Sequence, residues 1–186
     1  MPYLKEVRLH GRGGQGTVTA AELLAISAIN EGKFAQAFPS FGAERRGAPV
    51  LAFVRLGDER INLREQVYTP DAVVILDPTL LGAVNVIDGL KKDGTVILNT
   101  KDPPDNVKKK LGVAVKVATV DATKIALEEL GVSITNTAIL GAFAKTTGWV
   151  EIRSVRDAIK NRFPGAVGEK NAKSAGRAFD EVKVLK

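Results

Sequence analysis

The sequence predicts an α/β fold, Rossmann-like, with a mostly parallel sheet, helices on both faces and an antiparallel hairpin insertion. Short apolar stretches typical of buried parallel strands alternate with stretches of helical periodicity along the chain. A glycine-rich turn with the spacing G-x-G-x-x-G joins the first expected strand to the first expected helix. The 186 residues, 45% of them hydrophobic, can bury one core, so we expect a single domain over residues 1–186.

The first strand, turn and helix are the part around which we expect the sheet to be organised. Gly11 is expected to allow the sharp turn, Gly13 to let backbone approach a ligand, and Gly16 to let helix and sheet pack tightly. The helix is expected to begin at Thr17 and to stop at Gly32. Its free N–H groups and the positive end of its dipole favour an anion. The spacing fits a tight turn that binds nothing equally well.

The residues between the three glycines, Arg12, Gly14 and Gln15, place a cation and an amide on one turn. This pair suits an anionic ligand or a partner subunit. A nicotinamide dinucleotide site would need an acidic residue after the second expected strand, residues 34–38, and that position carries Pro and Ser. The first strand alternates in polarity, so one face is expected to meet a polar site or a subunit contact. His10 is expected to hydrogen-bond to the turn.

The loop of residues 39–49 is rich in glycine and charge. Its Arg45 and Arg46 follow Glu44 beside the expected crevice, and two arginines can fork onto phosphate or carboxylate oxygens. A Glu–Arg network on the surface is the alternative. The next two strands, residues 50–56 and 60–63, are expected to form the antiparallel hairpin through Gly57-Asp58.

The second half of the chain is expected to alternate strands and helices. The expected strands are residues 72–76, 95–98 and 113–120; the expected helices are a short one from Asp77 to Leu90, then 121–131, 136–145, 154–163 and 168–184; residues 101–112 are expected to be a polar connection. Asp77 and Asp121 are expected to be N-caps, and Ser154-x-x-Asp157 has capping-box form. Asn136 is expected to cap its helix, with a ligand contact left open.

Composition excludes several classes of site. With no Cys and one His, disulfides, cysteine-ligated iron–sulfur clusters and a conventional zinc site are not expected, so redox chemistry would need a borrowed cofactor. The net charge is +6, but only 5% of residues are aromatic and no nucleic-acid motif is found, so we expect no nucleic-acid partner. No apolar run approaches a membrane span and no signal-peptide pattern is found, so we expect a cytoplasmic protein. The abundance of Lys, Arg and Glu favours a thermophilic source.

Three motifs together resemble those of the gamma subunit of the 2-oxoacid:ferredoxin oxidoreductases, of pyruvate or 2-oxoisovalerate type. They are Gly11–Thr17, Pro39–Gly47 and Asn136-x-x-x-Leu140-Gly141, and the similarity covers nearly the whole chain. The resemblance implies a complex with alpha, beta and delta-type subunits that decarboxylates a 2-oxoacid, reduces ferredoxin and passes the acyl group to coenzyme A. It also implies that thiamine diphosphate and the iron–sulfur clusters lie on partner subunits, which agrees with the missing Cys.

Given this resemblance, we expect no catalytic residue in the chain and no cofactor bound by it alone. Our hypothesis is that its motif residues contribute to a shared coenzyme A site: Gly11, Arg12, Gly13, Gly14, Gln15, Gly16, Arg45, Arg46 and Asn136. Two alternatives stay open. A free nicotinamide-dependent oxidoreductase would need an acidic ribose partner and a catalytic Tyr, Lys or His near the crevice. A non-catalytic scaffold subunit would use the glycine turn only to dock its neighbours.

Overall fold

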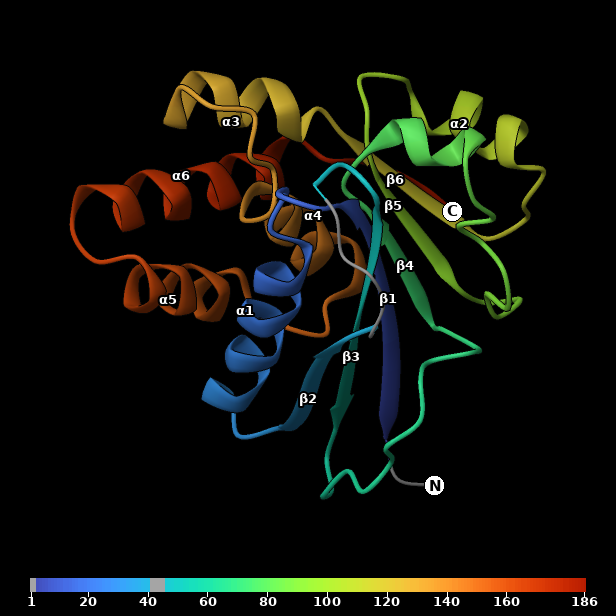
Figure 1. Ribbon diagram of the computed structural model, residues 1–186, viewed down its shortest axis with the longest axis horizontal. Helices are drawn as coiled ribbons and strands as arrows, with labels where there is room; N and C mark the ends of the chain where they lie inside the picture. Colours follow the sequence, from blue (N-terminus) through green and yellow to red (C-terminus); the bar gives the residue numbers. More distant parts are fainter. Residues whose placement is uncertain (1–2, 41–45) are drawn as a thin grey trace.

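Seven strands form one sheet in the part of the chain that the structure describes, residues 3–40 and 46–186 of a computed structural model (Figure 1). The elements are β1 (Leu4–Arg12), α1 (Thr17–Asn30), β2 (Phe34–Pro39), β3 (Pro49–Gly57), β4 (Ala72–Ile75), the 3₁₀-helix η1 (Pro78–Gly82), β5 (Thr95–Asn99), α2 (Pro104–Leu111), β6 (Lys116–Val120), α3 (Ala122–Leu130), α4 (Ala138–Thr147), α5 (Ile152–Arg162), α6 (Ala166–Glu181) and β7 (Lys183–Leu185). The strand order is β2-β3-β1-β4-β5-β6-β7. Strands β1, β4, β5 and β6 are parallel; β3 is antiparallel to both β1 and β2, and β7 to β6. The predicted mostly parallel α/β class is confirmed.

One face of the sheet is covered by α1 and α4, with α5 and α6 packed outside them (Figure 1). Val7 and Leu9 of β1 join the large apolar core on this side. The contact between α4 and α6 is so close that a Cβ at Gly141 would overlap the carbonyl group of Ala175. This face is therefore dry and tightly packed.

The opposite face is covered in two different ways. Over β4, β5 and β6, η1 and α2 enclose a smaller apolar core. Over β1 and β3, the strands present polar side chains, among them Arg8, His10 and Arg55, all buried. Irregular segments reach these side chains, since Arg55 Nη2 donates to the carbonyl oxygen of Gln66 and Arg8 Nη2 donates to that of Val86. The expectation that one side of the first strand meets a polar site is confirmed.

The expected hairpin between residues 50–56 and 60–63 is wrong. Residues 60–63 form no strand, and the antiparallel neighbours of β3 are β1 and β2. Because both edges of β3 are already paired, no edge remains for a following strand. Residues 60–63 instead lie beside β2, where Gln36 Nε2 donates to the carbonyl oxygen of Ile61 at 3.0 Å.

Several other expected elements differ from the structure. The polar connection contains α2, which has Pro104 in its first turn and the left-handed Gly112 at its end, both ordinary helix signals. The short helix after Asp77 shrinks to η1, followed by turns. The capping box is wrong, because α5 begins before Ser154 and its N-cap residue, Glu151, makes no side-chain cap. The last helix ends earlier than expected, and β7 follows it.

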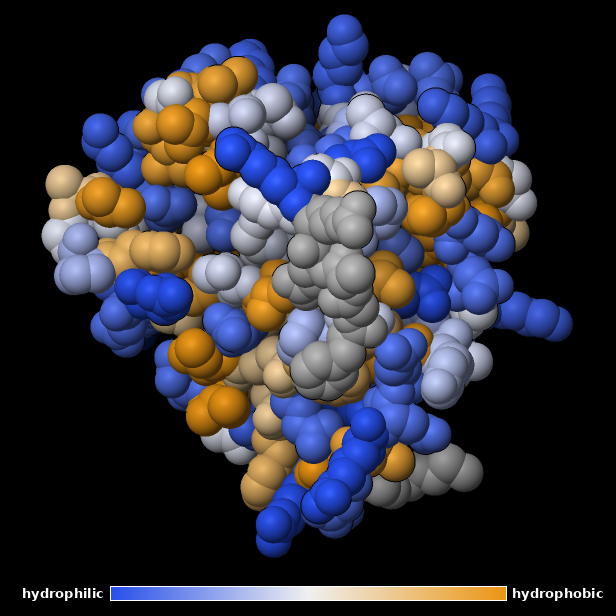
Figure 2. Space-filling view, viewed as in Figure 1, coloured by the Kyte–Doolittle hydropathy of each residue, from blue (hydrophilic) through white to orange (hydrophobic). Residues whose placement is uncertain are grey.

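The surface carries exposed apolar side chains beside the edge strand β2. Ile26 and Ile29 of α1 and Phe34 of β2 are among them, and Ile26 and Ile29 line a shallow groove with Ala35. In Figure 2, orange side chains gather at the lower left, over α1 and β2. No helix in the described part of the chain combines the length and the apolar character that a membrane span needs.

Candidate functional site

The glycine-rich turn begins later than the sequence suggests. Strand β1 continues to Arg12, so Gly11 lies inside the strand and its expected role in the turn is wrong. The turn is made by Gly14, with φ +94°, and Gly16, with φ +74°, and Gln15 N donates to the carbonyl oxygen of Arg12 at 3.0 Å. Positive φ is a conformation that side chains disfavour, so these two positions need glycine for the turn itself.

Gly11 and Gly16 are also places of close approach. A Cβ at Gly11 would overlap the hydroxyl of Thr17, so Gly11 is the residue that lets α1 start directly against the strand. A Cβ at Gly16 would overlap the side-chain amide of Asn136. The helix–sheet packing role expected of Gly16 therefore belongs to Gly11, and Gly16 makes room for the segment that precedes α4.

Gly13 pairs with the protein's own backbone. Its N–H donates to the carbonyl oxygen of Ala48 at 2.9 Å, and its carbonyl oxygen accepts from Gly47 N at 3.1 Å. We expected this backbone to be the part that approaches a ligand. It instead ties the turn to the segment that leads into β3.

Arg12 and Gln15 are held inside a polar cluster with Asp77 and Thr79, which follow β4. Gln15 Nε2 donates to Asp77 Oδ2 at 2.7 Å, and Gln15 Oε1 accepts from the backbone N–H of Arg12 at 2.8 Å. Arg12 Nε lies 3.3 Å from Asp77 Oδ2, and Arg12 Nη2 donates to Thr79 Oγ1 at 2.8 Å. Arg12 and Gln15, which we expected to face a ligand, instead bond to Asp77 and Thr79 and stabilise the turn.

Asp77 anchors this cluster and also caps η1, as predicted, by accepting from the backbone N–H of Thr79 at 2.9 Å. Burial alone would raise the pKa of Asp77. Hydrogen bonds from Thr79 and Gln15, together with the nearby Arg12, outweigh burial and hold that pKa below its ordinary value. Asp77 is therefore a carboxylate at neutral pH, and it neutralises Arg12.

The start of α1 retains the features of an anion site. Its first intrahelical bond runs from Ala20 N to the carbonyl oxygen of Gly16, so the N–H groups at positions 17–19 have no partner within the helix. The first turn of α1 has no acidic residue and no side-chain cap. Thr17 Oγ1 is buried and has no hydrogen-bond partner among the described residues. Unpaired donors at the positive end of a 14-residue helix favour a negative ligand.

Two further candidate residues lie at this turn. Arg46 is exposed; its backbone bridges to Gly13 and its side chain runs past Gly14, with Cγ 4.0 Å from where a Cβ would stand. Asn136 is buried against Gly16, and since the N-cap of α4 is Thr137, the cap role expected of Asn136 is wrong. Arg45 and Glu44 lie outside the described residues.

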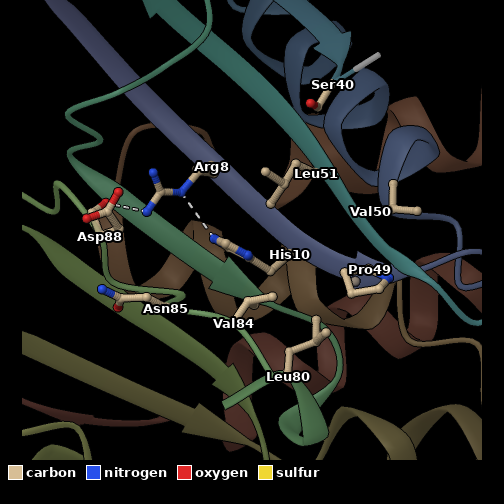
Figure 3. Close-up of a pocket in the computed structure, with 11 residues that line it drawn as sticks. Arg8, His10, Ser40, Pro49, Val50, Leu51, Leu80, Val84, Asn85 and Asp88 are labelled. Carbon is tan, nitrogen blue, oxygen red and sulfur yellow. Dashed lines mark hydrogen bonds between the residues drawn. The ribbon is translucent and has the colours of Figure 1, made fainter. Parts of the chain in front are cut away.

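A second polar site, which sequence reasoning missed, lies on the polar face of β1 (Figure 3). A pocket of about 360 Å³ is lined by residues from β1, β3, η1, the turns after η1 and the position after β2: Arg8, His10, Gly11, Ser40, Pro49, Val50, Leu51, Leu80, Val84, Asn85 and Asp88. Arg8 Nε donates to His10 Nε2 at 3.1 Å, so the expected bond from His10 to the turn is wrong. The alternating polarity of the first strand was the one signal for this site.

Burial is the main cause that lowers the pKa of His10 to about 3, and the adjacent Arg8 adds to it; the carbonyl of Val86 acts weakly in the other direction. Burial also lowers the pKa of Arg8. His10 is therefore a neutral acceptor at physiological pH, beside a buried guanidinium.

Comparison with known proteins identifies the family. The model for the family "Pyruvate ferredoxin/flavodoxin oxidoreductase" matches residues 6–181. The pyruvate/ketoisovalerate oxidoreductases common subunit gamma of Thermococcus kodakarensis is 58% identical over 183 residues, covering 96% of this chain and 97% of that protein. The crystal structure of the pyruvate oxidoreductase subunit PORC of Thermotoga maritima superposes with a TM-score of 0.87 at 41% identity, covering 98% of this chain and 99% of that one.

A larger enzyme shares the fold alone. The 2-oxoglutarate:ferredoxin oxidoreductase of Magnetococcus marinus gives a TM-score of 0.73 at 17% identity, over 94% of this chain and 30% of that one. The family match and the full-length relatives decide the assignment. This chain belongs to the pyruvate ferredoxin/flavodoxin oxidoreductase family, as the gamma subunit of a multi-subunit 2-oxoacid oxidoreductase complex.

Proposed function

We propose that this gamma subunit contributes the start of α1 and the turn before it to a coenzyme A site shared with other subunits. The N–H groups at the start of α1 have no partner within the helix, and its first turn has no acidic residue; this observation carries the proposal. The Magnetococcus enzyme, in which 30% of the chain matches this fold, was solved with coenzyme A bound. Coenzyme A carries a pyrophosphate and a 3′-phosphate, the type of group that such a helix terminus attracts.

The described residues divide into two roles. Backbone N–H groups at positions 17–19, the exposed Arg46 and the buried amide of Asn136 would contact the anionic part of coenzyme A. Arg12 and Gln15 would hold the turn in shape through Asp77, because their polar atoms are already bonded there. Arg45 remains a candidate for the first role by its position in the sequence.

In this proposal, the decarboxylation and electron-transfer steps take place on the partner subunits. Alpha, beta and delta-type subunits would hold thiamine diphosphate and the iron–sulfur clusters and would pass electrons to ferredoxin, in a cytoplasmic complex. The absence of Cys supports this division, because cluster ligands are normally cysteine thiolates. Residues 1–186 would act as one domain within that complex, and their exposed apolar side chains on α1 and β2 offer surface for a neighbouring subunit.

The sheet order argues against a free nicotinamide enzyme. In a dinucleotide fold, the strand that supplies the acidic ribose partner lies parallel beside the first strand. Here β1 is flanked by antiparallel β3 and by parallel β4, whose end carries Asp77. Asp77 is committed to Arg12 and Gln15, so it is not available to a ribose. No observation favours this alternative over the coenzyme A site.

The test is the Arg46→Ala variant in the assembled complex, with Arg153→Ala on α5 as a matched exposed control. Loss of one charge-assisted contact is expected to raise KM for coenzyme A about 10-fold, while kcat and KM for the 2-oxoacid stay unchanged. An unchanged KM for coenzyme A in a correctly assembled complex would refute a role of Arg46. If Asn136→Ala also left it unchanged, the proposed site would fail and a purely scaffolding role would remain.

A further inference from the structure

The pocket on the polar face of β1 has no role in the coenzyme A proposal, and its contents differ from those of an ordinary structural cluster. We propose that this pocket, beside Arg8 and His10, binds a small carboxylic acid with a short apolar body. The proposal goes beyond the function given above and stands independently of it.

The first argument is a buried guanidinium that forms no ion pair in the described part of the chain, where the carboxylate of Asp88 only partly offsets the lowering of its pKa by burial. Arg8 is 7% exposed, and its hydrogen-bond acceptors are neutral: His10 Nε2, and the carbonyl oxygens of Val86 and Asp88, both of which accept from Nη2. Among the residues described, no ion pair joins Arg8 to a carboxylate. A buried guanidinium normally has an anionic partner, because taking it out of water is costly.

Arg55 shows what a structural arginine looks like on the same face of the sheet. Its Nε donates to Glu6 Oε1 at 2.8 Å, and the guanidinium lies over the ring of Phe38. Arg55 thus has its carboxylate within the chain. Arg8, on the neighbouring strand, faces a pocket where Arg55 has a carboxylate.

The second argument is the shape and lining of the pocket. About 360 Å³ is at the lower end of small-molecule sites. Leu51, Leu80 and Val84 supply apolar walls, while Ser40 and Asn85 add polar groups (Figure 3). A guanidinium at one end of an apolar cavity matches a carboxylate that carries a few carbon atoms. An inorganic anion would leave the apolar walls unused.

The third argument concerns the charges around His10. Arg8 faces it from its own strand, and Asp88 lies beyond Arg8 in the turn after η1. In the free protein Arg8 disfavours the charged imidazole. A carboxylate bound at Arg8 would offset that positive charge and raise the pKa of His10. Because His10 is the single histidine of the chain, its ring signals report on this pocket alone.

The test uses the full chain and butanoate as the probe, with neutral butanamide and inorganic phosphate as comparisons at equal ionic strength. Butanoate is expected to shift the His10 ring resonances saturably, and calorimetry is expected to give the same Kd. Butanamide is expected to bind at least about 10-fold more weakly, because a charged hydrogen bond is lost. Phosphate is expected to bind more weakly than butanoate because it has no apolar body. Equal binding of butanoate and butanamide, or no shift with butanoate, would overturn the proposal, and equal binding of phosphate would overturn its apolar part.

Variants separate this pocket from the coenzyme A site. Arg8→Lys keeps the charge but loses the forked geometry, and is expected to weaken butanoate about 10-fold. Val84→Trp is expected to fill the pocket from its partly exposed wall while Arg8 itself stays unchanged in the sequence, and to abolish binding even where Arg8 variants fold poorly. Arg46→Ala is expected to leave butanoate binding unchanged. Unaltered binding in Val84→Trp would show that butanoate binds elsewhere and would contradict the assignment.

Discussion

The two sides of β1 are built from alternate residues of one strand, yet they differ in almost every physical respect. Val7 and Leu9 face α1 and are completely buried in an apolar core. Glu6, Arg8 and His10 face the other way, where irregular segments rather than helices cover them. The helix side belongs to the apolar core, and both candidate sites lie on the polar side and at the end of the strand.

This difference shows how one strand can serve stability and binding together. A site needs charged groups held in fixed places, and such groups are unstable in a core unless partners surround them. The period-two alternation of a strand supplies both environments without an extra element. The turn at the end of β1 is held on the polar side by the hydrogen bond from Gln15 to Asp77.

The largest expected effect comes from breaking the helix side. Leu9→Ala is expected to lower the free energy of unfolding by about 2–5 kcal/mol, because it removes buried methyl groups and leaves a cavity beneath α1. The measurement is urea unfolding of the full chain. The control is Leu4→Ala on the same strand, where Leu4 is 36% exposed and the loss should stay below about 1 kcal/mol. Equal losses at the two positions would contradict the described difference between the faces.

The next largest expected effect is a pH dependence of the free energy of unfolding, which comes from His10 on the polar side of β1. The pKa of His10 is about 3 in the folded state, against an ordinary 6.5, so the unfolded state binds a proton that the folded state does not between these values. Stability therefore rises with pH across that window and should fall by about 2 kcal/mol from pH 7 to pH 5.

This pH effect is checked by comparing urea unfolding of the wild type with that of His10→Gln at both pH values. The variant should lose the part of the slope that His10 contributes. Protonation of the His10 ring with a midpoint near 6.5 in the folded protein, seen by NMR, would be inconsistent with a buried neutral imidazole.

The smallest expected effect concerns the brace below the glycine turn. Asp77→Asn removes the charge that holds Arg12 and Gln15, and is expected to cost about 1 kcal/mol at pH 7. Since the pKa of Asp77 is lowered in the folded state, its stabilisation is present above the ordinary carboxyl pKa and is lost as pH falls through the folded value. The difference between wild type and variant should therefore shrink at pH 3. Asp93→Asn, at an exposed position, serves as the control. An equal loss of stability in that variant would contradict the role of Asp77 in stabilising the turn.

Much of the fold could be predicted because its signals are local. Asp77 and Asp121 cap their helices as expected, and the apolar runs after Pro70 and Gly94 are strands. The composition expected of a thermophilic source agrees with the thermophilic relatives. The strands that pair with β3 could not be predicted from the sequence. Gly57-Asp58 has the composition of a hairpin turn, although the neighbours of β3 in the sheet are β1 and β2.

The strand, turn and helix of the candidate site could be predicted from the sequence, but the contacts of its residues could not. The glycine spacing identifies a strand, turn and helix, whereas the role of each glycine depends on residues distant in sequence, such as Asn136 beside Gly16. The same holds for Arg12, whose partners Asp77 and Thr79 follow another strand. The Arg8 pocket was missed because its walls come from segments far apart in the sequence, and the bond from Arg8 to Val86 spans 78 residues.

A structure of the assembled complex with coenzyme A tests the central claim most directly. We expect its phosphate oxygens at hydrogen-bonding distance from the backbone N–H groups at the start of α1, with Arg12 still bonded to Asp77 and Thr79. Coenzyme A bound entirely by other subunits, with no atom near the turn from Gly13 to Thr17, would contradict the account.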